Sequence, residues 1–164
     1  MLRKTVKEIS RFFGHEKENL NLITSAAFDS RSVKSGALFF AIKGEREDGH
    51  DFLQDVAKKG GVAAVVSHTY TKENFGLALI PVLDVVQALH ALAKEIHRST
   101  HSTVIAVSGS VGKTTTKEFV ATLLREKYVV AKTPNNWNSQ LSLPLWLINR
   151  EEGEEVLVLE MGMS

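Results

Sequence analysis

The chain has 164 residues, enough for one ordinary domain or two small ones. Hydrophobic residues make up 43% and charged residues 24%, as in a typical globular protein, and 20 basic residues nearly balance 19 acidic ones. This balance gives no electrostatic bias towards nucleic acid. The lack of cysteine excludes disulfides and thiolate metal sites, and no apolar run is long enough to span a bilayer. We therefore expect a soluble, cytoplasmic protein with no nucleic-acid partner and no membrane insertion.

The first half of the chain alternates between apolar residues at helical spacing and short continuous apolar runs. Helices and strands that alternate in this way indicate an α/β fold. Glycines end or separate these segments, as turn and helix-end glycines do. The expected helices are residues 5–13 and 51–59, and the expected strands are residues 20–28, 37–42, 62–66 and 77–80.

Two polar stretches in this half carry side chains that suit an anionic ligand. Residues 29–32, with the sequence DSRS, follow the first expected strand, and residues 43–50 form a charged loop bounded by glycines. An arginine can give two hydrogen bonds to one phosphate through its planar guanidinium group. The alternative is that the DSRS stretch is only a turn bonded to itself, and spacing alone does not separate the two.

A helix joins the two halves of the chain. Asp84 is expected to cap it, and apolar residues keep helical register to about Arg98. We place a domain boundary just before this helix. Residues 1–83 then form a small N-terminal domain, and residues 84–164 begin a second one.

The strongest motif runs over residues 104–118, VIAVSGSVGKTTTKE. An apolar stretch typical of a buried strand leads into a turn with Gly109 and Gly112, and Lys113 and Thr114 open a helical pattern. This is the order of a phosphate-binding loop, in which helix N–H groups and the helix dipole face an anion. The lysine would reach the outer phosphates, and the threonine hydroxyl would bind Mg²⁺.

One position of this motif is irregular, because Val107 stands where the usual spacing places a glycine. The alternative interpretation is a glycine turn that only caps a helix. The strand before the turn and the amphipathic helix after it favour a nucleotide site.

The rest of the second half predicts two helices and two more strands. The first helix continues to about residue 127, and a second covers residues 141–149, with Pro144 tolerated in its first turn. The strands are residues 128–131 and 156–159. With the strand before the loop they form a three-stranded parallel sheet, which is small for a nucleotide-binding domain, so we expect the chain to be the first part of a longer domain.

Glu160 ends the last expected strand. Ligands of parallel α/β sheets bind beyond the carboxyl ends of the strands, where the phosphate-binding loop also lies. A strand-end glutamate alone would be interpreted as facing solvent. Beside such a loop we interpret it as a ligand of Mg²⁺, direct or through water, together with Thr114.

Nearly the whole chain resembles the Mur ligases, the ATP-dependent amino-acid-adding enzymes of peptidoglycan precursor synthesis. The segments DSR at 29–31, SGALFFA at 35–41, KGER at 43–46 and DGHDF at 48–52 are similar to the family's UDP-sugar-binding domain. Residues 109–118 are similar to its ATP loop, in which the irregular spacing noted above is normal. The resemblance implies a small N-terminal α/β UDP-sugar-binding domain, followed by the start of a parallel-sheet P-loop domain.

The Lys117-Glu118 pair is typical of the family member that joins D-alanyl-D-alanine to a UDP-N-acetylmuramoyl-tripeptide. We also expect the protein to be a monomer. The implied chemistry is phosphorylation of the tripeptide carboxylate by ATP, followed by attack of the dipeptide amine on the acyl phosphate. The resemblance implies ATP-binding residues Gly109, Ser110, Val111, Gly112, Lys113, Thr114 and Thr115; catalytic residues Lys113, Asn136 and Asn138; substrate-binding residues Ser30, Arg31, Lys43 and Gly44; and Mg²⁺ ligands Thr114 and Glu160.

One family pattern is only partly met. The two asparagines and Pro144 match N-x-N-x-x-x-G-x-P, whereas Ser142 replaces the glycine, which affects how closely the backbone can approach a ligand. His50 is interpreted as part of a helix entry rather than as a catalyst.

Three alternatives stay open. The chain could belong to the related ligase that adds the third amino acid, to a non-catalytic nucleotide-binding or UDP-sugar-binding module, or to an unrelated P-loop kinase or GTPase. The lack of an N-K-x-D signature argues against a GTPase. The family's second-metal ligands, adenine-binding residues and C-terminal domain would lie beyond Ser164, so we expect no ligase activity from this chain alone.

Overall fold

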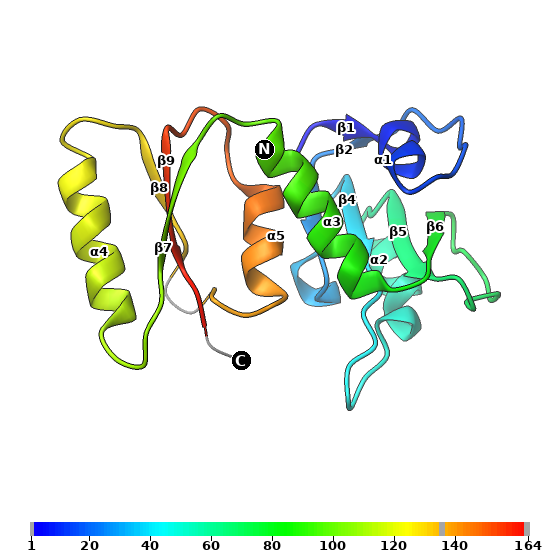
Figure 1. Ribbon diagram of the computed structural model, residues 1–164. Helices are drawn as coiled ribbons and strands as arrows, with labels where there is room; N and C mark the ends of the chain where they lie inside the picture. The colour runs from blue at the N-terminus through cyan, green and yellow to red at the C-terminus, as the bar shows by residue number, and fades with distance from the viewer. Residues whose placement is uncertain (1, 135–136, 163–164) are drawn as a thin grey trace. The chain divides into compact units, whose positions relative to one another are not determined.

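The structure is a computed structural model, and it describes residues 2–134 and 137–162. The chain divides after Leu92 into two compact units, and each unit has its own parallel sheet (Figure 1). The division falls inside α3 (Val85–Arg98). The α/β class expected from the sequence is therefore confirmed, whereas the domain boundary after residue 83 stays a prediction.

The sheet of the first unit has four parallel strands in sequence order, namely β3 (Ser25–Ala27), β4 (Ala37–Phe40), β5 (Ala63–Ser67) and β6 (Ala78–Val82). All four residues of β4 are buried, as expected for a strand that is covered on both faces. Pro81 lies in the edge strand β6, where the missing N–H does not interrupt the ladder.

The single strand expected over residues 20–28 is wrong. The segment forms two short strands in different sheets: β2 (Leu22–Ile23) pairs antiparallel with β1 (Lys4–Thr5), and β3 pairs parallel with β4. Thr24 lies between them, and its N–H donates to the carbonyl of Gly36 (3.0 Å). The two sides of Thr24 thus pair with different partners, β1 and β4, which an apolar run alone does not reveal.

Helices complete the first unit. A capping box of Thr5 and Glu8 opens α1 (Val6–Phe12), as the helical pattern predicts, and α2 (Leu53–Lys58) follows the 3₁₀ turn η2 (Gly49–Phe52). A second 3₁₀ turn, η1 (Ser30–Ser32), lies between β3 and β4. One face of the sheet packs on a core that includes Ala27, Val33, Phe39, Leu53, Val56, Ala64 and Val66.

The second unit is a three-stranded parallel sheet in the order β7 (Thr103–Val107), β9 (Val156–Glu160), β8 (Val130–Lys132). The strand that comes last in the sequence therefore lies in the middle. Figure 1 shows α4 (Lys113–Leu124) and α5 (Ser142–Asn149) on opposite faces of this sheet. Ala121, Val156 and Val158 form the centre of the core on one face.

The second unit differs from expectation at one strand. The strand expected over residues 128–131 is found at β8, because the N–H of Tyr128 still donates to the carbonyl of Leu124 (2.9 Å) and prolongs the helix end. Pro144 lies in the first turn of α5, as expected. Within the part of the chain that the structure describes, no helix has the length and apolar character needed to cross a membrane.

Candidate functional site

The predicted phosphate-binding loop joins β7 to α4. Gly112 is the N-cap of α4 and has a φ of 77°, and Gly109 has a φ of 148°, so both use backbone conformations that L side chains disfavour. The helix begins at Lys113, so the unpaired N–H groups of its first turn lie at the loop. The geometry suits an anion, because the positive end of the helix dipole lies at the same place.

The irregular position of the motif has a simple structural explanation. Val107 is the last residue of β7 and lies opposite Glu160 in the register with β9. Its carbonyl accepts a hydrogen bond from the N–H of Met161 (2.9 Å). A regular strand residue needs no glycine, and its pairing brings the loop and Glu160 to the same edge of the sheet.

Lys113 is half-buried, and its ammonium donates to the carbonyl of Gly109 (2.8 Å). The positive charge is therefore held at the loop by a residue of the loop itself. A phosphate bound to the N–H groups at the start of α4 would lie next to that charge.

Thr114, Asn138 and Glu160, three of the predicted site residues, lie in contact. The Thr114 hydroxyl donates to Oε2 of Glu160 (2.9 Å), and Nδ2 of Asn138 donates to Oε1 (3.1 Å). The N–H of Glu160 donates to the hydroxyl of the buried Thr133 (3.0 Å). Both oxygens and the backbone of this glutamate are thus fixed in place.

The carboxyl group of Glu160 is buried, with 5% of its side chain exposed. Burial raises its pKa, but the hydrogen bonds from Thr114 and Asn138 and the ammonium of Lys117 outweigh burial, so the pKa lies below the ordinary value of 4.5. The group is therefore a carboxylate near neutral pH. A carboxylate oxygen beside a threonine hydroxyl is a donor set that Mg²⁺ prefers.

A magnesium ion here would need more oxygens than the protein places at this point. Among residues 2–134 and 137–162, no group of three or more His, Cys, Asp or Glu side chains could hold a metal. Phosphate oxygens and water would supply the remaining ligands of an octahedral ion. The two protein oxygens fit a metal that arrives with a nucleotide.

Lys117 belongs to the same cluster, and the sequence indicated it only as a family feature. Its side chain is fully buried, and its Nζ lies 3.3 Å from Oε2 of Glu160 and 3.8 Å from Oε1 of Glu118. A helical spacing of four residues from the buried Ala121 places it on the core side of α4. That spacing is the signal that could have revealed its burial.

The DSRS stretch of the first unit is a turn with internal hydrogen bonds, and its arginine side chain is exposed to solvent. The Asp29 side chain accepts from the N–H of Arg31 (2.9 Å), and its two oxygens accept from Nε and Nη2 of the same residue (2.7–3.1 Å). These hydrogen bonds lower the pKa of Asp29 and raise the pKa of Arg31. The arginine side chain is 87% exposed, so its Nη1 edge can meet an anion.

Ser30 lies in the same turn, and its carbonyl accepts from Nζ of Lys59 (2.7 Å). The loop that follows β4 is closed by a bridge between Lys43 and Asp48, and the N–H of Gly44 donates to the carbonyl of Glu47 (2.9 Å). The four predicted substrate-binding residues therefore lie on two turns of the first unit.

His50 is held at both ring nitrogens. Its Nδ1 lies 2.5 Å from Oδ1 of Asp48, its Nε2 accepts from the N–H of Ser67 (2.9 Å), and its ring stacks on Tyr70 at 5.1 Å. These contacts fix the entry to α2, in agreement with the structural role expected from the sequence. The ring also lines a pocket of about 490 Å³ that includes Lys43 and Tyr70.

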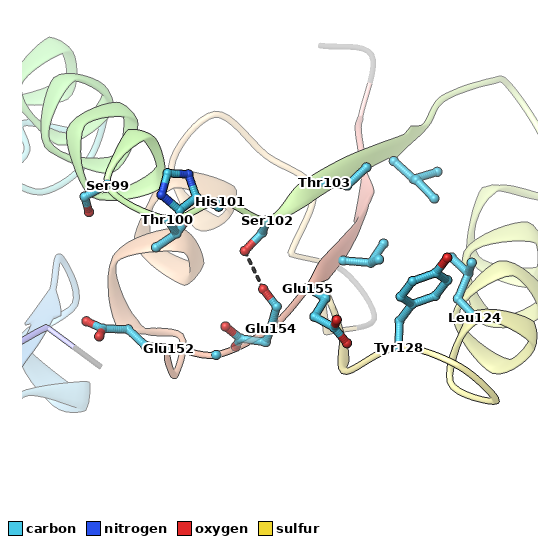
Figure 2. Close-up of a pocket in the computed structure, with 13 residues that line it drawn as sticks. Ser99, Thr100, His101, Ser102, Thr103, Leu124, Tyr128, Glu152, Glu154 and Glu155 are labelled. Carbon is cyan, nitrogen blue, oxygen red and sulfur yellow. Dashed lines mark hydrogen bonds between the residues drawn. The ribbon is translucent and has the colours of Figure 1, made fainter.

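A larger pocket, of about 780 Å³, lies at the opposite end of the second unit's sheet (Figure 2). It is lined by residues at the amino ends of β7 and β9, where the Ser102 hydroxyl donates to the carbonyl of Glu154 (2.6 Å). Ligands of parallel sheets bind at the carboxyl ends. The carboxylates of Glu154 and Glu155 already bond to Arg150 and to the N–H of Val129, so we do not assign this pocket to the site.

Asn136 lies outside the described residues. Asn138 is half-buried, and its carbonyl accepts from the N–H of Gly162 (3.0 Å). The hydroxyl of Ser142, at the family's glycine position, lies 2.8 Å from the hydroxyl of Ser139. This contact fixes the turn before α5 with side-chain hydrogen bonds.

Comparison with known proteins follows the same division of the chain. The profile described as "Mur ligase middle domain" matches residues 107–164, and the profile described as "Mur ligase family, catalytic domain" matches residues 22–97. The chain belongs to the Mur ligase family. Among curated Mur ligases it is 36% identical to the UDP-N-acetylmuramoyl-tripeptide–D-alanyl-D-alanine ligase of Bacillus subtilis and 30% identical to that of Escherichia coli.

Solved Mur ligase structures agree with this assignment. The chain superposes on MurF of Acinetobacter baumannii with a TM-score of 0.84 at 29% identity, over 98% of this chain and 36% of that one. It superposes on the MurF ligase of Thermotoga maritima, solved in complex with ADP, with a TM-score of 0.75 at 39% identity, over 84% of this chain and 31% of that one.

The Bacillus and Escherichia matches both cover 100% of this chain, but only 37% and 36% of those two ligases. The chain therefore spans about a third of the length of the curated relatives that it matches.

Proposed function

We propose that this chain provides the phosphate-binding loop and the UDP-sugar-binding domain of an ATP-dependent C–N ligase. The ligase joins D-alanyl-D-alanine to UDP-N-acetylmuramoyl-tripeptide in peptidoglycan precursor synthesis. The names of the relatives support the reaction. The observation that carries the proposal is the contact between Thr114 and Glu160, beside a loop built for phosphate. Because ATP and UDP-linked sugars are cytoplasmic metabolites, we place the reaction in the cytoplasm.

The site acts mainly by positioning and by charge. Lys113 neutralises the outer phosphates of ATP while the γ-phosphoryl group moves to the carboxylate of the tripeptide. The N–H groups of residues 109–115 hold the phosphates, and Asn138 orients Glu160 and meets the reacting carboxylate. Asn136 is the second catalytic asparagine of this proposal. Mg²⁺ held by Thr114 and Glu160 would neutralise charge on the phosphate oxygens.

The first unit binds the other substrate. Arg31 and Ser30 contact the diphosphate and uridine of the UDP-linked sugar, and Lys43 and Gly44 contact it from the next turn. The exposed guanidinium group of Arg31 supports this role, since it is the charged group of that turn that solvent reaches most freely.

The incoming dipeptide amine then attacks the acyl phosphate, which releases phosphate and leaves an amide.

Equilibrium binding tests the nucleotide part of this proposal. Titration of the 164-residue chain with ATP and Mg²⁺ should show saturable binding, and Lys113→Met should weaken it by about tenfold or more, since a charged hydrogen-bond partner of the phosphates is lost. Lys127→Met, which removes an exposed lysine beyond the end of α4, is the matched control and should bind as the unaltered chain does. Equal affinity in all three proteins would refute the assignment of the loop.

The acceptor is tested separately, in the full-length ligase that contains this chain. Amide formation with D-alanyl-D-alanine, and not with a single amino acid, is the expected result. The reverse preference would identify the related ligase that adds the third residue. Binding of ATP and of the UDP-linked sugar, without turnover in the presence of any acceptor, would identify a non-catalytic module.

A further inference from the structure

Lys117 is a buried ammonium group for which the proposed reaction has no use. Its side chain is 0% exposed, and within the described parts of the chain its Nζ has no hydrogen-bond partner of good geometry. A buried charge without compensation is strongly unfavourable, so an ion pair must hold it. The carboxylate 3.3 Å away, that of Glu160, provides this ion pair.

The same carboxylate oxygen serves two groups of α4. Oε2 of Glu160 accepts from the Thr114 hydroxyl at 2.9 Å and faces the Lys117 ammonium at 3.3 Å. Thr114 and Lys117 are three residues apart on one helix, so both project from the same side of it. The proposed metal ligand is therefore already paired with a positive charge that the protein itself supplies.

The wider cluster is electrically balanced. Glu118 lies 3.8 Å from the Lys117 ammonium and also contacts Lys132, on β8. Two lysines thus face two glutamates. The nucleotide-free site offers a free cation little net negative charge.

We infer that Lys117 is a positioning residue, a built-in counter-cation that holds Glu160 against Thr114 and makes metal binding depend on the nucleotide. With the glutamate charge offset, the attraction for a divalent cation comes mainly from the phosphates. Mg²⁺ then enters together with the nucleotide and not before it. This inference rests on the proposed metal role of Thr114 and Glu160.

Manganese binding to the nucleotide-free 164-residue chain tests it. Mn²⁺ can be followed by the electron paramagnetic resonance of the free ion at pH 7. Lys117→Met keeps most of the apolar stem and removes the charge, and it should tighten Mn²⁺ binding by about tenfold or more, because an opposing charge is lost at close range. Lys117→Arg keeps the charge and should bind Mn²⁺ as weakly as the unaltered chain.

Lys127→Met is the control for overall charge, because it removes one exposed lysine outside the cluster. Its Mn²⁺ affinity should match that of the unaltered chain. The inference is wrong if the Lys117→Met protein folds and its Mn²⁺ affinity is unchanged. It is also wrong if Lys117→Met and Lys127→Met tighten Mn²⁺ binding equally.

A double-mutant cycle tests the pairing through stability, and if Lys117→Met alone does not fold, the readout is whether the double variant folds again. Urea unfolding is measured for Lys117→Met, for Glu160→Gln and for the double variant. Each single variant should lower the urea midpoint, and the double variant should recover much of the loss, because neither charge is then left alone. A double variant that is as unstable as the sum of the two, or that also fails to fold, would overturn the pairing.

A negative result in the Mn²⁺ comparison or in the double-mutant cycle can be distinguished from failure of the proposed function. The cycle and the Mn²⁺ comparison use protein without nucleotide, whereas titration of the unaltered chain with ADP and Mg²⁺ tests the nucleotide site. Absence of ADP binding would refute the proposed function while the charge pairing could still be demonstrated.

Discussion

Glu160 is held by hydrogen bonds or an ion pair to three separate stretches of the chain. Thr114 and Lys117 reach it from α4, Asn138 from the loop before α5, and Thr133 from the end of β8. Such a carboxylate is fixed before any ligand arrives, so little side-chain freedom remains to be lost on binding. Two predictions at the scale of single residues follow from these contacts.

The first concerns pH. Because the pKa of Glu160 is lower in the folded chain than its ordinary value of 4.5, its stabilising contribution is present above pH 4.5 and is lost as the pH falls through the folded-state value. Glu160→Gln removes this contribution. The stability difference between the unaltered chain and Glu160→Gln, measured by urea unfolding from pH 7 to pH 3, should therefore shrink towards the acid end. Glu126→Gln, an exposed change outside the cluster, is the control, and a difference that stays constant with pH would contradict the prediction.

The second concerns the Thr114 hydroxyl. Thr114→Ala should weaken binding of ADP with Mg²⁺ by about tenfold, since one metal ligand and one hydrogen bond to Glu160 are lost. Binding of ADP in the presence of a chelator should change little, because the loop N–H groups remain. Calorimetric titration measures both affinities. Thr122→Ala, at an exposed position of the same helix, should leave both unchanged, and an equal loss with and without Mg²⁺ in Thr114→Ala would argue against a metal role.

At the scale of elements, the turn between β7 and α4 depends on a glycine in the left-handed region. Gly112 has a φ of 77°, and an added Cβ would meet no atom within 4 Å, so a substitution there costs backbone strain and not a steric clash. The turn and the helix start are therefore coupled. Relief of the backbone strain caused by a side chain at the N-cap position would move the N–H groups that a bound phosphate would contact.

Gly112→Ala should lower the free energy of unfolding by about 1–2 kcal/mol and also weaken ADP binding. Gly153→Ala is the matched control, because Gly153 has a φ of 105°, has equally open surroundings and lies in the same unit, before β9. The control should lose stability and keep its ADP affinity. Urea unfolding and ADP titration separate the two effects, and unchanged ADP affinity in Gly112→Ala would show that the loop tolerates the strain.

At the scale of the whole molecule, the chain carries the elements that we propose to bind two substrates, and it spans about a third of its relatives' length. We expect no ligase turnover from the 164-residue chain alone. ATP-dependent release of phosphate in the presence of the tripeptide substrate and D-alanyl-D-alanine is the measurement. Release above the level of a Lys113→Met control would contradict this expectation.

The sequence predicts much of this molecule because its signals are local. The Asp84 cap is confirmed by hydrogen bonds from the N–H groups of residues 86 and 87, and the loop from β7 to α4 follows from glycine spacing. The meeting of Thr114 and Glu160 follows from the rule that carboxyl ends of parallel strands share an edge. By contrast, the break at Thr24 depends on β1 and β4, the two different partners of this segment, and the ion pair of Lys117 with Glu160 depends on tertiary packing. Single-residue patterns do not encode such partners.

The middle position of β9 has a consequence for synthesis. β7 and β8 are not neighbours, and each is hydrogen-bonded to β9, which follows both of them in the chain. While a ribosome makes the protein, the strands of the first unit can pair early, whereas β7 and β8 must wait for β9 to emerge from the exit tunnel. During that interval β7 and β8 lack their hydrogen-bonding partner, and unpaired strand edges of this kind favour aggregation.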